Sequence, residues 1–175
     1  MQDCLPFGQA AFFHDIGKLR VPTSILEMPG KLSGEDRMII QRHPNDAKKI
    51  LASLEQESLF LHNPGFYHLA ICAAQFHHEW WDGAGYPLGI SGKSIPLIAR
   101  ITSICDAFDA ITSARHYHNA QSLDEAFSQI QKHAGSQFDP VLSHFLMQHQ
   151  SVFSDLLWFS TPNSAHIDSI GAEGR

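Results

Sequence analysis

The stretch HHEWWDGAGYP, residues 77–87, constrains the fold of this chain more than any other. It places two adjacent histidines, His77 and His78, directly before an acid and a turn built from glycine, tyrosine and proline. Imidazole is the commonest protein ligand for transition metals near neutral pH. Glycine and proline hold a rigid turn beside these imidazoles. The stretch therefore indicates a catalytic pocket with metal on one side and a shaped loop on the other, rather than a structural zinc site.

Helical periodicity dominates the sequence on both sides of this stretch, and alternating strand-like runs are scarce. Capping boxes are expected where Ser33 precedes Asp36 and where Ser122 precedes Glu125. Residues 7–16 are expected to form the end of a helix that carries His14 and Asp15. Further helices are expected over 33–43, from 47 through 54, over 67–76 and 97–112, from Ser122 onward, and from Asp139–Pro140 to about His149. We therefore expect an all-α bundle with a long ordered loop over residues 80–96.

Length and charge limit the organisation and the partners. The chain has 175 residues, 43% of them hydrophobic, which suits one domain over residues 1–153 and a flexible C-terminal tail over residues 154–175. The formal net charge of −6 argues against a broad basic surface for a nucleic-acid polymer. An anionic substrate would need local positive charge, which bound metals could supply.

The cysteines and the apolar runs indicate the cellular compartment in which the protein is expected. Cys4, Cys72 and Cys105 form no CxxC pair, and the last two lie in apolar runs where buried thiols are expected. A disulfide framework is not indicated, which favours a reducing cytoplasm. The sequence holds no apolar run of about 18 residues, so no membrane segment is expected, and the first residues do not read as a signal peptide.

Several potential metal ligands are spread along the chain. Each alone could be a packed or solvated side chain, but they lie on separate segments that a helical bundle could bring together. They are His14, Asp15, His43, His77, His78 and Asp106. Asp106 and Asp109 share a face of an otherwise apolar helix, where buried carboxylates would be costly without cations. Glu79 is expected either to orient a ligand histidine or to cap the loop, and the first role is preferred.

Four motifs occur in one order: HDIGK at 14–18, RHP at 42–44, HHEWWDGAGYP at 77–87 and DAFDAIT at 106–112. Together they resemble the HD-GYP domain of the HD metal-dependent phosphohydrolase superfamily, from about Ala10 to Leu146. The resemblance implies an HD-domain-like helical bundle that hydrolyses cyclic di-GMP. It also implies two divalent metal ions, iron or manganese, that share a bridging hydroxide.

The resemblance assigns roles residue by residue. It implies metal ligation by His14, Asp15, His43, His77, His78 and Asp106. It implies catalytic roles for Asp15 and Lys18, and substrate contacts from Lys18, Tyr86, Asp109 and Arg115. Diguanylate cyclase domains of the GGDEF type are the protein partners that it suggests.

Two departures from the family pattern keep a second function open. The chain begins about ten residues before His14, so we expect the family's usual first helix to be missing. His118 stands where the family usually has a cationic Arg or Lys, and imidazole is mostly neutral at this pH. The alternative is therefore a catalytically impaired module that binds cyclic di-GMP or a partner signalling domain. Hydrolysis of another nucleotide is a third reading, which the GYP turn disfavours.

Overall fold

The computed structural model describes residues 5–57, 64–113 and 121–160. Arg115 and His118, which the resemblance singles out, therefore lie outside the described residues. The described part of the chain is helical and contains no strand, apart from one isolated bridge between Ala134 and Phe138. The expected all-α fold is confirmed.

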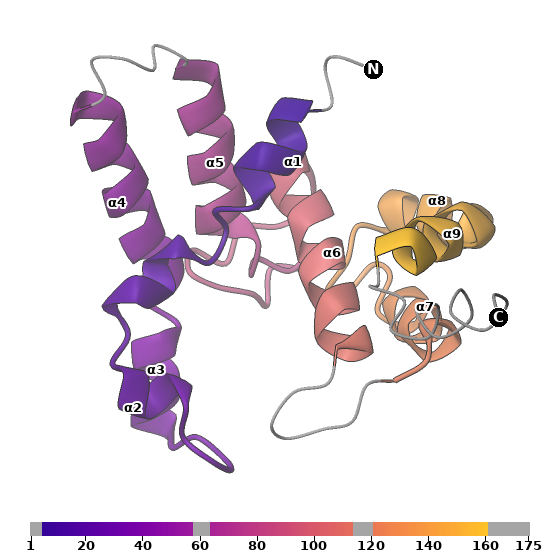
Figure 1. Ribbon diagram of the computed structural model, residues 1–175, viewed down its shortest axis with the longest axis horizontal. Helices are drawn as coiled ribbons and strands as arrows, with labels where there is room; N and C mark the ends of the chain where they lie inside the picture. Colours follow the sequence, from indigo (N-terminus) through magenta and orange to yellow (C-terminus); the bar gives the residue numbers. More distant parts are fainter. Residues whose placement is uncertain (1–4, 58–63, 114–120, 161–175) are drawn as a thin grey trace, which may run out of the picture.

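The helices are arranged around one long central helix, α6. In chain order they are α1 (Leu5–Ala11), η1 (Ile16–Arg20), α2 (Thr23–Leu26), α3 (Gly34–Ile40), α4 (His43–Glu57), α5 (Pro64–Phe76), η2 (Gly92–Ser94), α6 (Leu97–Thr112), α7 (Leu123–Lys132), α8 (Pro140–Gln148) and α9 (Gln150–Ser160). Figure 1 shows α1, α4 and α5 on one side of α6 and α7, α8 and α9 on the other.

Local capping chemistry explains where several helices begin. The Ser33 hydroxyl accepts a hydrogen bond from the Asp36 amide at 3.1 Å, and the Ser122 hydroxyl accepts one from the Glu125 amide at 3.2 Å. Both capping boxes are complete, as the sequence predicts. Asp139 caps α8 by accepting from the Val141 amide at 2.8 Å. Helix α6 spans the predicted residues 97–112.

Two hydrophobic clusters meet at α6. The first joins α1, α4, α5 and α6 and consists of Ala10, Ala47, Leu51, Ala70, Ala73, Ala74 and Ile98. The second joins α6, α7, α8 and the segment before α8 and consists of Ile104, Phe108, Ala126, Phe127, Ile130, Phe138 and Leu146. Small alanine side chains let α1, α4 and α5 approach closely, which brings the ends of these helices together.

Three expectations about local structure need correction. Helix α1 ends at Ala11, so His14 and Asp15 lie in a turn and not on a helix. Bonds from the His14 amide to the Ala11 carbonyl, and from Ile16 to Phe13, span three residues and tighten the chain there. Cys105 is exposed and Cys72 half-buried, because Cys105 falls on the outward stripe of α6 with Ile101.

The C-terminal boundary also differs from the simplest reading of the sequence. Helix α9 runs through Ser160 and so crosses the predicted boundary between residues 153 and 154. Residues 161–175 of the expected tail lie outside the described part of the chain. Whether the family's first helix is missing stays a prediction; α1 ends at Ala11, three residues before His14. Among the described helices, none has the length and apolar character needed to cross a membrane.

Candidate metal centre

The six candidate ligands converge on one place, and most reach it from helix ends. His14 and Asp15 lie in the turn between α1 and η1, and His43 is the first residue of α4. The adjacent pair His77 and His78 directly follows α5, whereas Asp106 lies within α6. Because backbone at a helix end is freer to turn than a helix interior, adjacent residues there can point at the same centre.

Gly17 lets the turn that carries Asp15 approach α4. A Cβ atom at Gly17 would lie 1.9 Å from the His43 carbonyl oxygen and 2.7 Å from the Ala47 amide nitrogen. Real Cβ atoms do not tolerate such contacts, so a side chain here would push η1 away from α4. The sequence reasoning missed this role, because the close approach depends on a tertiary contact. The glycine in HDIGK was the available signal.

Three of the imidazoles share one hydrogen-bonding pattern. The Nδ1 atoms of His14, His43 and His77 lie 2.9, 2.8 and 3.0 Å from the carbonyl oxygens of Ala11, Ile40 and Ala74. A carbonyl oxygen only accepts, so each Nδ1 donates and carries the proton. Nε2 is therefore the ring nitrogen left to bind metal, in the arrangement by which backbone carbonyls orient metal-binding histidines.

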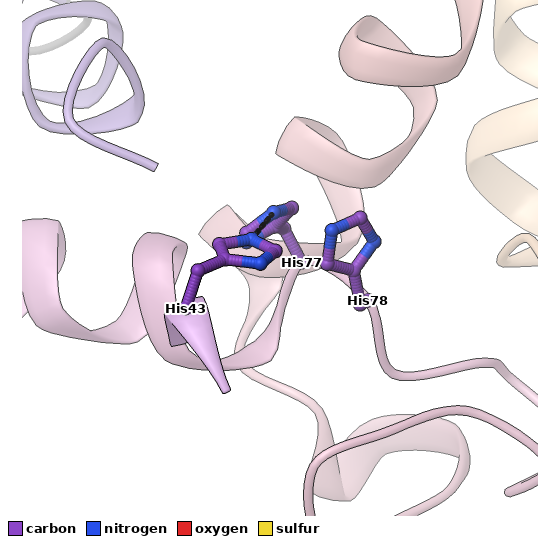
Figure 2. A group of neighbouring side chains, drawn as sticks. All are labelled: His43, His77 and His78. Carbon is purple, nitrogen blue, oxygen red and sulfur yellow. Dashed lines mark hydrogen bonds between the residues drawn. The ribbon is translucent and has the colours of Figure 1, made fainter. Parts of the chain in front are cut away.

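The inward-facing nitrogens crowd one another. Figure 2 shows His43, from the start of α4, beside His77 and His78, which follow α5. The Nε2 atoms of His43 and His77 are 3.4 Å apart. With both Nδ1 atoms protonated, two neutral rings turn lone pairs toward each other, and a cation ligated by both relieves that repulsion.

Asp15 lies at the centre of the cluster. Its Oδ1 is 3.3 Å from His43 Nε2 and 3.9 Å from His77 Nε2, and its Oδ2 is 3.4 Å from His14 Nε2. Lys18 donates to Oδ2 at 2.6 Å. Oδ1 is buried and accepts no hydrogen bond within the described residues. A buried carboxylate oxygen without a partner is costly, and a metal ion would satisfy it.

The ligand atoms form two groups, and the atoms of each lie within 4.8 Å of one another. We call His43, His77 and His78 the imidazole group, and His14, His77 and Asp106 the mixed group. His77 belongs to both. In the mixed group, His14 Nε2 lies 3.7 Å from Asp106 Oδ1. These nitrogen and oxygen donors suit divalent transition metals, so the residues present fit a metal centre.

The electrostatic environment differs between the rings. Burial, aided by the charges of neighbouring histidines, lowers the pKa of His77 to about 4 and that of His78 to about 3. Both rings are therefore neutral and able to bind metal near neutral pH. Burial alone would also lower the pKa of His14, but hydrogen bonds to Asp106 and Asp15 outweigh it and raise the pKa to about 10.

The Asp15 carboxylate remains ionised across the physiological range. Burial would raise its pKa, but His14 and Lys18 outweigh that effect and hold the pKa far below its usual value. The pKa of Asp106 is also lowered, because the hydrogen bond and charge of His14 outweigh the effect of burial. Two anionic carboxylates therefore face a cluster of imidazoles.

The glycine-rich loop closes one side of the centre. The Tyr86 ring stacks on His78, with ring centroids 4.7 Å apart and planes inclined by 25°. The Tyr86 amide donates to the His78 carbonyl at 3.1 Å. A Cβ atom at Gly85 would lie 2.3 Å from the Trp80 amide nitrogen, so glycine is required for this contact. Burial raises the pKa of the Tyr86 phenol, which stays protonated.

Of the remaining predicted residues, Lys18 contacts the ligand cluster, whereas Asp109 and Glu79 do not. Lys18 contacts Asp15, whereas Asp109 is exposed on α6, accepts a hydrogen bond from the Ser113 hydroxyl at 3.1 Å and belongs to neither ligand group. Glu79 does not orient a histidine as interpreted from the sequence. Its Oε1 accepts from the Leu88 amide at 2.6 Å, a contact within the loop.

A family model described as an HD domain matches residues 3–142. Three curated relatives have similar sequences. A cyclic di-GMP phosphodiesterase response regulator from Xanthomonas campestris is 38% identical over 75% of this chain and 32% of its own length. A probable cyclic di-GMP phosphodiesterase from Vibrio cholerae is 38% identical over 92% of this chain and 36% of its own length. A 3'3'-cGAMP-specific phosphodiesterase from Vibrio cholerae is 34% identical over 82% of this chain and 26% of its own length.

A solved structure supports the fold. A cyclic GMP-AMP specific phosphodiesterase from Vibrio cholerae superimposes with a TM-score of 0.52 at 19% sequence identity. The match covers 93% of this chain and 44% of that one. At this identity the likeness concerns the fold alone. The chain spans about a quarter to just over a third of the length of the curated relatives described above.

Proposed function

Because this chain belongs to the HD domain family of metal-dependent phosphohydrolases, we propose that it hydrolyses a cyclic dinucleotide, with cyclic di-GMP as the first candidate. The observation that carries the proposal is the buried, unpartnered Oδ1 of Asp15 between the two ligand groups. The names of relatives at 34–38% identity support the substrate class. The activity is proposed for the HD-domain part, because the relatives are much longer.

In this proposal the imidazole group and the mixed group would each hold one divalent ion, iron or manganese, and the Asp15 carboxylate would be a further ligand. When bound, such ions make hydroxide available near neutral pH and offset phosphate charge. The neutral rings of His77 and His78 supply ligands without first losing a proton. The Nδ1 bonds to backbone carbonyls fix the rings, so ligand geometry is set before metal arrives.

The remaining roles concern the phosphodiester. Lys18 is held by Asp15 at the edge of the centre, where its ammonium can meet phosphoryl oxygens as their charge grows. Tyr86, stacked on His78, would line the groove on the loop side. Asp109, on the exposed face of α6, and Arg115 would also contact the ligand. A cytoplasmic location belongs to the same proposal and accords with the free thiols of Cys72 and Cys105.

The alternative function of a binding module remains because of His118. This histidine stands where the family usually has a permanently charged Arg or Lys, so the affinity of the chain for a substrate phosphate would be lower. The chain would then serve as a module that binds cyclic di-GMP or a GGDEF-type partner without turning it over.

One assay separates these functions. The protein, loaded anaerobically with Fe(II) or Mn(II), is incubated with cyclic di-GMP, 3'3'-cGAMP and a linear diguanylate, and the products are resolved chromatographically. We expect cleavage of cyclic di-GMP, and loss of that cleavage in Asp15→Asn, which keeps the shape of the side chain. Binding of the nucleotide by the metal-loaded protein without cleavage would favour the module. Preference for 3'3'-cGAMP would move the substrate assignment to that dinucleotide.

A further inference from the structure

The carboxylate of Glu79 is buried beside the candidate metal centre, but within the described part of the chain it forms no hydrogen bond to a ligand residue. The side chain is 2% exposed and directly follows His78. Its Oε1 accepts the Leu88 amide at 2.6 Å, although Leu88 itself is 59% exposed on the loop. The buried Glu79 carboxylate therefore binds the backbone of a residue whose side chain is exposed, whereas most carboxylates are solvated by water at the surface.

This bond and a second one bracket the Tyr86–Pro87 step of the loop. On one side the Tyr86 amide donates to the His78 carbonyl at 3.1 Å. On the other side the Leu88 amide donates to Glu79. Proline has no amide hydrogen, so Pro87 contributes no bond of its own. The two bonds to neighbouring residues 78 and 79 therefore fix the position of the Tyr86 ring against His78.

Glu79 also connects the loop to the rest of the fold. Together with Arg100, Ser103 and Asp139 it lines a cavity of about 10 Å³. Its Oε2 is buried and accepts no hydrogen bond within the described residues. Arg100 donates to Asp139 Oδ2 at 2.6 Å and to the Ile95 carbonyl at 2.9 Å. The Arg100–Asp139 ion pair thus lines the same cavity as the Glu79 carboxylate.

We propose that Glu79 is a positioning residue that holds the Tyr86 loop against His78 and thereby shapes the substrate side of the centre. The effect on turnover rests on the proposed function, whereas the effect on the loop does not. Glu79 itself touches neither the ligand groups nor, by this proposal, the reacting phosphate. Its influence passes through Leu88 to Tyr86, and from the stacked Tyr86 ring to the groove beside His78.

Amide hydrogen exchange of the whole chain tests the structural half of the proposal. The Leu88 amide should be protected in the wild type despite the exposure of its side chain. In Glu79→Ala the protection should fall about tenfold or more, the loss expected for one buried hydrogen bond. Glu79→Gln keeps an acceptor oxygen and should restore most of it. Unprotected Leu88 in the wild type overturns the proposal, and that measurement requires no variant to fold.

Steady-state kinetics and metal analysis test the functional half. Glu79→Ala should raise the KM for cyclic di-GMP by about 10- to 100-fold, the usual loss for a residue acting through another. Metal content and kcat should change little, and Glu79→Gln should recover the wild-type KM. A fall in kcat and metal content at unchanged KM contradicts the proposal, since it would make Glu79 a support of the ligand histidines.

Asp139→Asn is the matched control. Asp139 is also buried, lines the same cavity and bonds Arg100, but it caps α8 and makes no bond to the loop. It should lower thermal stability and leave Leu88 protection and KM near the wild-type values. Equal losses of Leu88 protection in Glu79→Ala and Asp139→Asn would show that Glu79 stabilises the fold in general and does not specifically position the loop. If the wild type cleaves no cyclic dinucleotide, the proposed function fails while the exchange results still decide the positioning role.

Discussion

The imidazole group and the mixed group share His77 but differ in burial and in charge. In the imidazole group, His43 and His77 are 0% and 1% exposed, and burial lowers the pKa of all three rings. In the mixed group, His14 and Asp106 are half-buried and attract each other as an imidazolium and a carboxylate. Without metal, the histidines of the imidazole group are neutral and have free nitrogen lone pairs, whereas His14 of the mixed group is protonated.

The difference follows from what surrounds each group. The imidazole group lies where α4 and the end of α5 pack together, and among the described residues Asp15 is the carboxylate close to His43, at 3.3 Å. The mixed group faces α6, whose Asp106 carboxylate stabilises a protonated His14. A neutral nitrogen site favours borderline metals, and a site with a carboxylate accepts harder ions such as manganese. We expect the two sites to differ in metal affinity and in its dependence on pH.

Replacing the shared residue should have the largest effect. His77→Ala removes a ligand from both groups, so both proposed metals should be lost. Hydrolysis should fall about 1,000-fold or more, because the metals contribute several kcal/mol to the transition state. Metal analysis after dialysis and the cyclic di-GMP assay measure the two effects. His68→Ala, on the outer face of α5, is the matched control and should change neither. Full metal occupancy in His77→Ala would show that the two groups are not joined through this residue.

Replacing an unshared residue should separate the groups. His78→Ala should empty the imidazole group alone, and Asp106→Asn the mixed group alone, so each variant should lose roughly one of two metals. Hydrolysis should fall about 100-fold in each, a smaller loss than in His77→Ala because one ion remains. Titration with Mn(II), followed by electron paramagnetic resonance, counts the remaining sites. Loss of both metals from either variant would mean that the groups behave as one cooperative site.

The sequence predicts the members of these groups better than their geometry. Capping boxes at Ser33 and Ser122 and the span of α6 are correct, because each depends on residues close in sequence. The end of α1 was placed too late, since periodicity cannot distinguish a last helical turn from the tight turn that holds His14.

Tertiary contacts account for most of what was missed. The clash that a side chain at Gly17 would make with the His43 carbonyl involves residues on different elements. The bond from Leu88 to Glu79 crosses a loop whose path no periodicity describes. The exposure of Cys105 depends on which face of α6 stays uncovered between its two hydrophobic clusters. The division of the ligands into two groups likewise required the packed arrangement of the helices.

Gly17→Ala should disturb the imidazole group through the backbone. The added Cβ must move away from the His43 carbonyl, which separates Asp15 from His43. We expect a loss of about 1–3 kcal/mol in the free energy of unfolding, typical of overpacking, and an approximately tenfold loss of hydrolysis. Urea unfolding and the hydrolysis assay measure these changes. Gly34→Ala is the matched control, because nothing lies within 4 Å of its added Cβ, and it should be near wild type. An equally stable and active Gly17→Ala protein would contradict the close approach.

The most specific effect is the release of a proton when metal binds. His14, with a pKa raised to about 10, is protonated near neutral pH, and it must lose that proton before Nε2 can bind metal. His77 and His78, with pKa values lowered to about 4 and 3, have none to lose. Metal binding to the mixed group should therefore release about one proton. The affinity of the mixed group for metal should fall about tenfold for each unit of pH below 10. The imidazole group should release none, and its affinity should stay constant as the pH falls from neutral toward 4. Calorimetric titration of His78→Ala and Asp106→Asn, in buffers of different ionisation enthalpy, measures the two groups separately. Equal proton release from both variants would remove the distinction between the groups, because each would then bind metal against the same protonated histidine.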